Sequence, residues 1–320
     1  MKIKEIINKT LEEEMNLNPD VFILGEEVGK SGGPHGLTKN LMAKFGKHRV
    51  LDTPISEMGF TGLAVGASYL GLRPIIDYMT WNFALQSIDH IINSCAKTRY
   101  MSGGRITCPI VFRGPNGFNE GYAAQHTQDF STFYGNIPGL KVVAPYTAKD
   151  HSGLLRAAIR DPDPVVILEN EMLYDDEYES EYEEGYIQSL NRAVIEKGGQ
   201  DLTIIGVSLS LREIFKAEIE LSKIGISAEI INLVSIRPLD TNTIFKSVNK
   251  TGRLLIVDYS YPLYGLSSEI SAQVYENCFL KKPIKRLNAK DVPTPYSKSL
   301  EDMVYPKKED IIEAAKTLMN

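Results

Sequence analysis

Residues 49–81 read RVLDTPISEMGFTGLAVGASYLGLRPIIDYMTW, and this stretch decides the fold class. The short apolar runs at 49–54 and 73–81 are typical of buried parallel strands, and residues 56–71 between them predict a helix. Parallel neighbours need a crossover of about this length, and the crossover is usually helical. The stretch therefore predicts a βαβ unit. It also places one carboxylate, Glu57, just after a strand in a segment otherwise suited to burial.

The same alternation extends along the chain. Further strands are predicted at 21–29, 108–117, 141–147, 164–170, 202–208, 227–234, 253–258 and 284–288, and helices at 3–17, 82–99, 148–160, 209–224, 241–249, 263–277 and 308–319. Such alternation predicts an α/β protein with mainly parallel sheets flanked by helices.

The segment 171–184, EMLYDDEYESEYEE, interrupts this alternation. It is rich in Asp, Glu and Tyr and contains no Lys or Arg. A dense charged run is typical of a solvated connection, so we expect two domains, 1–176 and 198–320, joined by an acidic linker at 177–197. The alternative is that the run is a docking strip for a basic partner.

Composition argues against several classes of protein. The net charge of −6 gives no indication of a nucleic-acid partner, and no apolar run is long enough to suggest a membrane span. Cys95, Cys108 and Cys278 are too far apart in the sequence to suggest a disulfide framework or a zinc site, which favours a reducing compartment. The N-terminal residues resemble neither a signal nor a transit peptide. We therefore expect a bacterial-type cytoplasmic protein or, as the alternative, an organelle-encoded protein of the matrix or stroma.

The sequence contains no complete, self-contained catalytic motif. A GxxxxGK[ST] phosphate loop, a GxGxxG after the first strand, HExxH and GxSxG are all absent. Instead, Glu57, Met79, Phe83 and His126 lie at or after the carboxyl ends of predicted strands, and the carboxyl edge of a parallel sheet is where ligands bind. Each residue also has a structural interpretation. Glu57 can interact with a helix dipole, Phe83 can belong to the core, and His126 can be a hydrogen-bonded loop residue.

The helix after Glu57 is unusually rich in small residues. Glycine inside a helix costs about 1 kcal/mol, but small residues let two backbones approach closely and gain dispersion energy. We expect this helix to pack against another subunit or a neighbouring helix, with Glu57 near the interface. The small residues are Gly59, Gly62, Gly66, Ala67 and Gly71.

Several longer motifs carry a family resemblance. They are LDTPISEMGF, YMTWNFALQSIDHIINSCAKTRYMSGG, PIVFRGPNG, AAQHTQDF and LKVVAP, and later INLVSIRPLD and DVPTPYSK. Together they resemble the β subunit of the pyruvate dehydrogenase E1 component, which belongs to the thiamine-diphosphate enzymes built like transketolase. The resemblance implies a pyrimidine-binding domain followed by a transketolase C-terminal-like domain.

The resemblance also implies roles for the four loop residues. Glu57 is expected to hydrogen-bond N1′ of the cofactor's aminopyrimidine and to favour the tautomer that removes the thiazolium C2 proton, while the coenzyme is the electron sink. Met79 and Phe83 match positions around that ring. His126 matches a histidine that orients substrate and takes part in acyl transfer to the lipoyl group.

A monovalent-cation site, commonly potassium, is a further feature of the family. Its positions, largely backbone carbonyls, correspond to Ile110, Ala158, Ile159, Asp161 and Asp163. Asp163 departs from the asparagine of the human-type enzyme. The alternative is an ordinary helix end and turn without an ion.

The chain lacks the GDG motif that holds diphosphate and magnesium in this superfamily. The resemblance therefore implies that an E1 α subunit supplies that half of the site, with Mg²⁺, in an α2β2 heterotetramer. It also implies a lipoyl-bearing E2 acyltransferase as partner, and no nucleic-acid or membrane partner. The missing half disfavours single-chain transketolase and deoxyxylulose-phosphate synthase.

The implied activity is pyruvate decarboxylation on thiamine diphosphate, with acetyl transfer to lipoyl-E2 (EC 1.2.4.1), which links glycolysis to acetyl-CoA. GPNG and AAQHTQ favour pyruvate. The alternatives are a branched-chain 2-oxoacid or acetoin dehydrogenase β subunit and, from another class, a non-catalytic scaffold that docks E2. The loop at 258–268 departs from the family pattern at Tyr259, Ser260 and Ser267, which affects expectations for E2 contact more than for catalysis.

Overall fold

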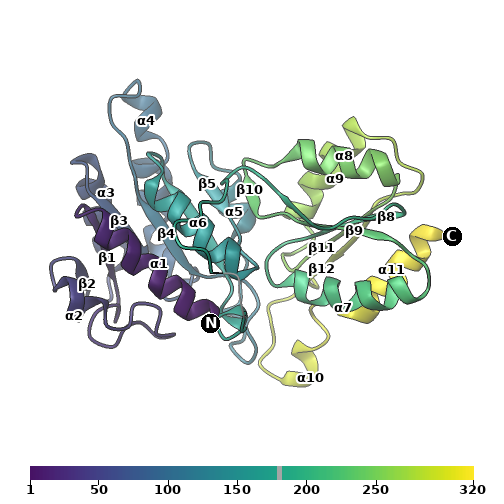
Figure 1. Cartoon of the computed structure of the whole chain (residues 1–320), viewed down its shortest axis with the longest axis horizontal. Coiled ribbons are helices and arrows are strands. Elements are labelled where there is room, and N and C mark those ends of the chain that lie inside the picture. The colour runs from purple at the N-terminus through teal and green to yellow at the C-terminus, as the bar shows by residue number, and fades with distance from the viewer. Residues whose placement is uncertain (179–181) are drawn as a thin grey trace. The chain divides into compact units, whose positions relative to one another are not determined.

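A computed structural model describes residues 1–178 and 182–320 (Figure 1). The chain forms two compact units, neither of which is continuous in sequence. Met1–Asn116 and Phe133–Leu190 make up the first, and Gly117–Thr132 and Asn191–Asn320 the second. A loop of the first half of the chain thus belongs to the second unit. The limits 1–176, 177–197 and 198–320 stay a prediction.

The first unit contains a parallel sheet whose strands are buried along most of their length. Its strands run in the order β5-β6-β4-β3-β1-β2, and each neighbouring pair is parallel. They are β1 (Val21–Gly25), β2 (Val50–Asp52), β3 (Arg73–Asp77), β4 (Val111–Pro115), β5 (Lys141–Val143) and β6 (Val165–Glu169). The α/β class with parallel sheets is confirmed.

Helices α1 (Ile3–Leu17), α3 (Glu57–Tyr69) and α6 (Ala148–Arg160) lie where the sequence predicts them. The single helix predicted over 82–99 is wrong. The chain there forms a 3-10 turn, η1 (Phe83–Ser87), a π-helix, η2 (His90–Cys95), and the short α4 (Thr98–Met101). Side chains compete with the backbone ladder in this region, because the Thr98 and Tyr69 hydroxyls both donate to the Ser94 carbonyl. The short helices α2 (Leu41–Phe45) and α5 (Ser131–Gly135) were not predicted.

The second unit is built on a smaller sheet in the order β12-β11-β8-β9-β7. Helices α8 and α9 cover one face of it, and α7 and α11 cover the other (Figure 1). The strands are β7 (Val194–Lys197), β8 (Leu202–Gly206), β9 (Ala228–Asn232), β11 (Leu254–Asp258) and β12 (Lys285–Asn288), with β10 (Ser235–Arg237) outside this sheet. The helices are α7 (Ser210–Lys223), α8 (Thr241–Thr251), α9 (Leu266–Asn277), α10 (Lys298–Glu301) and α11 (Lys308–Met319).

Strand β7 lies inside the segment expected to be linker. It pairs antiparallel with β9, with a bulge between Ile195 and Lys197. Its residues alternate between half-buried and exposed, and a short edge strand of this kind carries little hydrophobic signal in the sequence.

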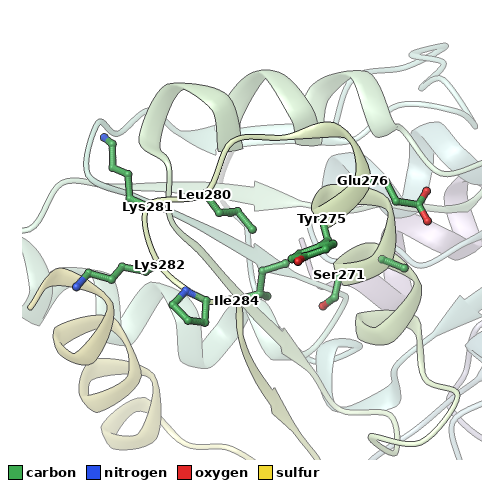
Figure 2. Close-up of a pocket in the computed structure, with 9 residues that line it drawn as sticks. Ser271, Tyr275, Glu276, Leu280, Lys281, Lys282 and Ile284 are labelled. Carbon is green, nitrogen blue, oxygen red and sulfur yellow. The ribbon is translucent and has the colours of Figure 1, made fainter.

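A hollow of the second unit opens beside α9. Figure 2 shows Ser271, Tyr275, Leu280 and Ile284 around it, with charged side chains such as Lys282 further out. None of the predicted site residues lines this hollow.

The departures from the family pattern at 258–268 form a buried hydrogen-bond cluster around Asp258. Ser260 donates its backbone N–H to Oδ1 (2.9 Å) and its hydroxyl to Oδ2 (2.6 Å), and Ser267 donates its N–H to Oδ2 (3.3 Å). The pKa of Asp258 is raised to about 6, chiefly by burial and further by the charge of Asp129. The hydrogen bonds from Ser260 act in the opposite direction. The backbone of this loop and the Ser260 hydroxyl thus supply hydrogen bonds to a buried carboxyl group.

We predict a pH signature from Asp258. Because its folded-state pKa exceeds the unfolded value, folding retains a proton that the unfolded chain releases. The contribution of Asp258 to stability is therefore present below about pH 4 and is lost as pH rises through about 6. In urea unfolding, the free energy of unfolding of the wild type relative to that of Asp258→Asn should fall by on the order of 1–3 kcal/mol as pH rises from about 4 to about 6. A pH-independent difference would contradict the assignment.

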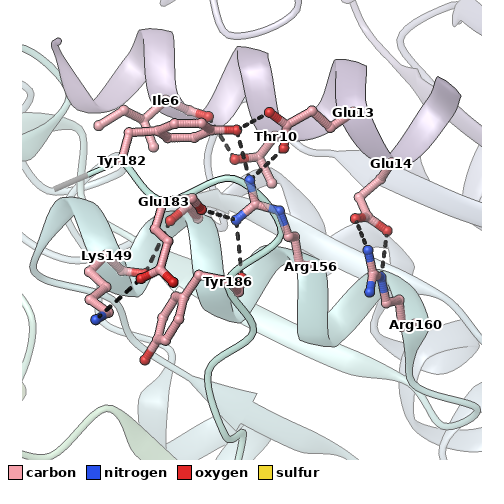
Figure 3. A network of polar contacts seen from close by, with 11 residues as sticks. Ile6, Thr10, Glu13, Glu14, Lys149, Arg156, Arg160, Tyr182, Glu183 and Tyr186 are labelled. Atoms are coloured by element: carbon pink, nitrogen blue, oxygen red, sulfur yellow. Dashed lines mark hydrogen bonds and ion pairs between the residues drawn. The ribbon is translucent and has the colours of Figure 1, made fainter. Parts of the chain in front are cut away.

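The described part of the acidic run contacts the first unit through ion pairs and hydrogen bonds, while most of its acidic side chains stay exposed to solvent. Its role as the boundary between two domains stays a prediction. Asp175 pairs with Lys2 (2.9 Å) and Lys4 (2.8 Å). Further along, the buried Arg156 of α6 donates to Glu13 Oε2 (2.5 Å) of α1 and to the Tyr182 hydroxyl (2.7 Å) (Figure 3). Residues 179–181 lie outside the described residues. The run did not reveal these partners because the cations lie far away in the sequence.

Arg156→Met should detach residues 182–190 from α1 and α6. The guanidinium also donates to the Tyr186 carbonyl (3.1 Å), and hydrogen bonds to charged groups contribute about 1.5–3 kcal/mol. We expect a loss of that size in urea unfolding and faster proteolysis within 182–190. Arg160→Met is the matched control, since Arg160 pairs with Glu14 of α1 and its side chain is 42% exposed. Equal proteolysis of the two variants would contradict the role given to Arg156.

Candidate active site

Three neighbouring strands of the first sheet end together at one edge. Gly25 of β1 is in register with Asp52 of β2 on one side and with Asp77 of β3 on the other. The residues that follow these strands include Glu26 after β1, Glu57 after β2 and Met79 after β3. The sheet edge predicted from the sequence is therefore formed, and a carboxyl edge of this kind is the usual ligand site of an open parallel sheet.

Glu57 is the first residue of α3, and its side chain is buried, with 3% of the residue exposed. Within residues 1–178 and 182–320, its Oε2 has no hydrogen-bond partner. A buried carboxylate oxygen without a donor costs free energy, so the arrangement suits a partner from outside the chain that offers a donor or a proton. A mere interaction with the helix dipole would not require this burial.

Glu26 is a residue that the sequence interpretation missed. It is half-buried, and its Oε1 also lacks a hydrogen-bond partner in the described part of the chain. Burial raises the pKa of Glu26, and the charges of Glu57 and then Glu27 raise it further. The nearby Glu57 carboxyl group thus favours a proton on Glu26 at this edge. The signal was available, since LGEEVG places an acid at the end of an apolar run.

Met79 lies in a turn that a buried aspartate fixes. Its φ is 59°, in the left-handed region, and its N–H donates to Asp77 Oδ1 (2.9 Å). A non-glycine residue in this region costs free energy and needs support from its surroundings. Phe83 begins η1, which packs against α3, and both Met79 and Phe83 are half-buried. The structure thus brings the elements of Glu57, Met79 and Phe83 to one edge.

Asp77 is itself held by an ion network beneath this edge. Arg113 of β4 donates to Asp77 and, through Nε and Nη2, to Glu169 of β6 (2.9 and 2.6 Å). The Tyr174 hydroxyl also donates to Glu169 (2.6 Å). Burial opposes ionisation of Glu169, but the Arg113 guanidinium outweighs it and holds the pKa of Glu169 below its usual value. Charged residues inside apolar strand runs, as in PIVFRG, were the signal that the sequence interpretation overlooked.

Helix α3 presents an exposed apolar face beside Glu57. Ile55, just before the helix, is 84% exposed, and Met58 and Leu63 are 60% and 57% exposed. Gly66 lies on the same helix, and a Cβ there would meet nothing within 4 Å. Exposed large apolar side chains gathered around a buried acid are typical of an interaction surface. This surface fits the expectation of another subunit next to Glu57.

His126 lies in the second unit, within the loop 117–132. It is half-buried, its ring lies 6.4 Å from that of Tyr122, and its N–H donates to the Ala123 carbonyl (3.5 Å). The loop is tied to its own unit by the Gly121 N–H, which donates to Glu301 (2.9 Å). His126 and Glu57 thus belong to different units, and a joint role for them stays a prediction.

Four of the five predicted cation ligands lie around the end of α6. The Ile159 and Asp161 carbonyls accept from Arg73 Nη1 (2.7 and 3.2 Å), and the Ala158 carbonyl accepts from the Asp161 N–H (3.2 Å). The Ile110 carbonyl accepts from the Val165 N–H (3.0 Å). Each carbonyl has a second lone pair, but Arg73 already supplies positive charge here. These carbonyls already accept hydrogen bonds within the chain, and the potassium site stays a prediction.

Comparison with known proteins decides the family. Residues 1–177 match the family model for the transketolase pyrimidine-binding domain, and residues 191–311 match that for the transketolase C-terminal domain. The chain is 51% identical over 321 residues to a rice protein named pyruvate dehydrogenase E1 component subunit beta-2, mitochondrial, covering 99% of this chain and 85% of the relative. The chain belongs to the family of pyruvate dehydrogenase E1 β subunits. The resemblance and the enzyme class inferred from the motifs are confirmed.

Other relatives agree with this family. The β subunit of Chaetomium thermophilum is 52% identical over 324 residues (99% of this chain, 85% of the relative), and that of Rhizobium meliloti is 46% identical over 320 (99% and 70%). A solved structure titled split gene transketolase, inactive β4 tetramer, superimposes with a TM-score of 0.81 at 20% identity (100% of this chain, 98% of that chain). The last likeness concerns the fold alone.

The expected cytoplasmic location is wrong. The similar β subunits of rice, Arabidopsis, yeast and Drosophila are all named as mitochondrial, although a bacterial relative is also similar. The prediction rested on the composition of the N-terminal residues, which does not determine the location. Within residues 1–178 and 182–320, no helix has the length and apolar character needed to cross a membrane.

Proposed function

We propose that this E1 β subunit acts with an E1 α subunit to decarboxylate pyruvate and to transfer the acetyl group to a lipoyl-bearing E2. The observation that carries the proposal is the buried Oε2 of Glu57, which has no partner among the described residues, at the carboxyl edge of the first sheet. Such an oxygen fits the N1′ position of an aminopyrimidine, which can share a proton with a carboxyl group. Thiamine diphosphate, when bound, supplies the electron sink for loss of CO₂.

The chain's own residues then have defined tasks. Glu57 holds or shares a proton at Oε2, and its charge helps to raise the pKa of the neighbouring Glu26. Met79 and Phe83 form apolar walls for a planar heterocycle, with Met79 held by Asp77. We assign His126 to the orientation of substrate and to proton exchange during acyl transfer.

The second half of the cofactor site comes from the α subunit in this proposal. Within the described residues, no cluster of three or more His, Cys, Asp and Glu side chains is arranged to hold a metal ion. We assign Mg²⁺ and the diphosphate to the α chain because the sequence lacks the GDG motif that holds them in this superfamily. The exposed apolar residues of α3 provide its contact surface, in an α2β2 assembly.

Substrate profiling of the co-expressed α/β enzyme tests the choice of pyruvate. We expect kcat/KM for pyruvate to exceed that for 2-oxoisovalerate by about tenfold or more, because even one or two methylene groups change pocket affinity by about 10–200-fold. Acetoin serves as the third substrate. A preference for 2-oxoisovalerate or acetoin would make that compound the substrate without changing the proposed mechanism. No turnover of any of the three compounds would favour the scaffold role.

A further inference from the structure

Two of the three cysteines lie against each other inside the first unit. The Sγ atoms of Cys95, at the end of η2, and Cys108, just before β4, are 2.7 Å apart. Each residue is 1% exposed, and the Ser68 hydroxyl of α3 lies 3.1 Å from Cys108 Sγ. The sequence interpretation treated these residues as unrelated thiols because they lie 13 positions apart and form no CxxC motif.

The backbone on both sides of the pair is anchored. A Cβ at Gly139 would lie 1.9 Å from the Ala96 carbonyl oxygen, so the chain packs tightly over the residue after Cys95. The Cys108 N–H donates to the Pro162 carbonyl (3.2 Å), and the Cys108 carbonyl accepts from the Ile110 N–H (2.8 Å). Because the two sulfurs are already 2.7 Å apart, a bond between them, about 2.05 Å long, needs only a small shift of the side chains and leaves the anchored backbone in place.

We propose that Cys95 and Cys108 form a reversible disulfide when the protein meets a hydroperoxide. Residues 103–107, which precede Cys108, are exposed, so local opening of this loop gives a small oxidant access to Cys108 first. Disulfides that form inside reducing compartments are usually transient and redox-sensing. The modification site is distinct from the residues assigned to catalysis.

The chemistry balances in two steps. The Cys108 sulfur attacks one peroxide oxygen, the O–O bond breaks, and the leaving oxygen takes up the thiol proton to depart as water or an alcohol. The Cys95 sulfur then attacks the sulfenic sulfur of Cys108; the S–S bond forms, the S–O bond breaks, and water leaves. Two thiols are oxidised by two electrons, and the hydroperoxide is reduced.

The test uses the full chain with Cys278→Ser, which removes the remaining thiol, treated with hydrogen peroxide under native conditions. We expect both thiols to be lost to alkylation, a mass decrease of two hydrogens, a peptide cross-link between residues 95 and 108, and full recovery after dithiothreitol. Cys95→Ala in the same background is the control, in which Cys108 should instead gain oxygen. Two intact thiols, or oxygen addition at Cys108 without the cross-link in the parent, would overturn the proposal.

Discussion

Glu57→Gln should lower kcat of the α/β enzyme by about 10²–10⁴-fold, the range associated with a positioned proton-transfer group. The substitution keeps the size of the side chain and its place at the start of α3, but an amide cannot share a proton as the carboxyl group does. Because Oε2 has no hydrogen-bond partner in the described chain, the change should leave the fold of the β subunit intact. Steady-state kinetics with pyruvate and an artificial electron acceptor measure the effect.

Glu5→Gln is the matched control for this variant. Glu5 also lies in the first turn of a helix, but it is exposed and accepts from the Lys2 N–H (3.0 Å). A first-turn carboxylate contributes only about 0.3–1 kcal/mol through the helix dipole, so this variant should retain activity. Unchanged turnover in Glu57→Gln would reject the catalytic role and favour a scaffold subunit.

Arg113→Met should destabilise the first unit by about 3–5 kcal/mol, because removing one partner of a buried ion network leaves uncompensated charge. Here two carboxylates, Asp77 and Glu169, would lose their common cation while only 5% and 2% exposed. Urea unfolding of the purified chain gives the value. If the variant does not accumulate as folded protein, that outcome also indicates a large loss of stability.

Arg99→Met provides the comparison. Arg99 pairs with Asp163 (2.6 Å), but its side chain is 47% exposed, and pairs of that kind contribute about 0–1 kcal/mol. If both arginine variants lost the same small amount of stability, the network around Arg113 would not hold the sheet edge, and the support given to Met79 through Asp77 would lose its basis.

The main elements could be predicted because their hydrophobic pattern is strong. Helix α6 has the predicted bounds, and the buried strand β6 begins with the continuous apolar run VVIL. The 82–99 segment failed because its departure from an α-helix depends on contacts such as Tyr69 to Ser94. Those contacts arise only after α3 and η2 have packed together, and no periodicity within the segment encodes them.

The candidate site, too, could be predicted only in part from the sequence. Glu57 could be singled out because one acid in an apolar segment is unusual, but its burial and its neighbour Glu26 depend on the alignment of β1 with β2. The partners of the acidic run at 171–184 could not be predicted for a similar reason, since Lys2, Lys4 and Arg156 come to it from elsewhere in the chain. Local composition records the charge of a segment, whereas the fold determines what neutralises it.

Calorimetric titration of thiamine diphosphate with Mg²⁺, into the purified chain alone and into the co-purified α/β assembly, tests the shared cofactor site most directly. We predict saturable binding only to the assembly, because this chain supplies the pyrimidine side through Glu57 but not the diphosphate side. Tight, magnesium-dependent binding to the isolated chain would contradict the account.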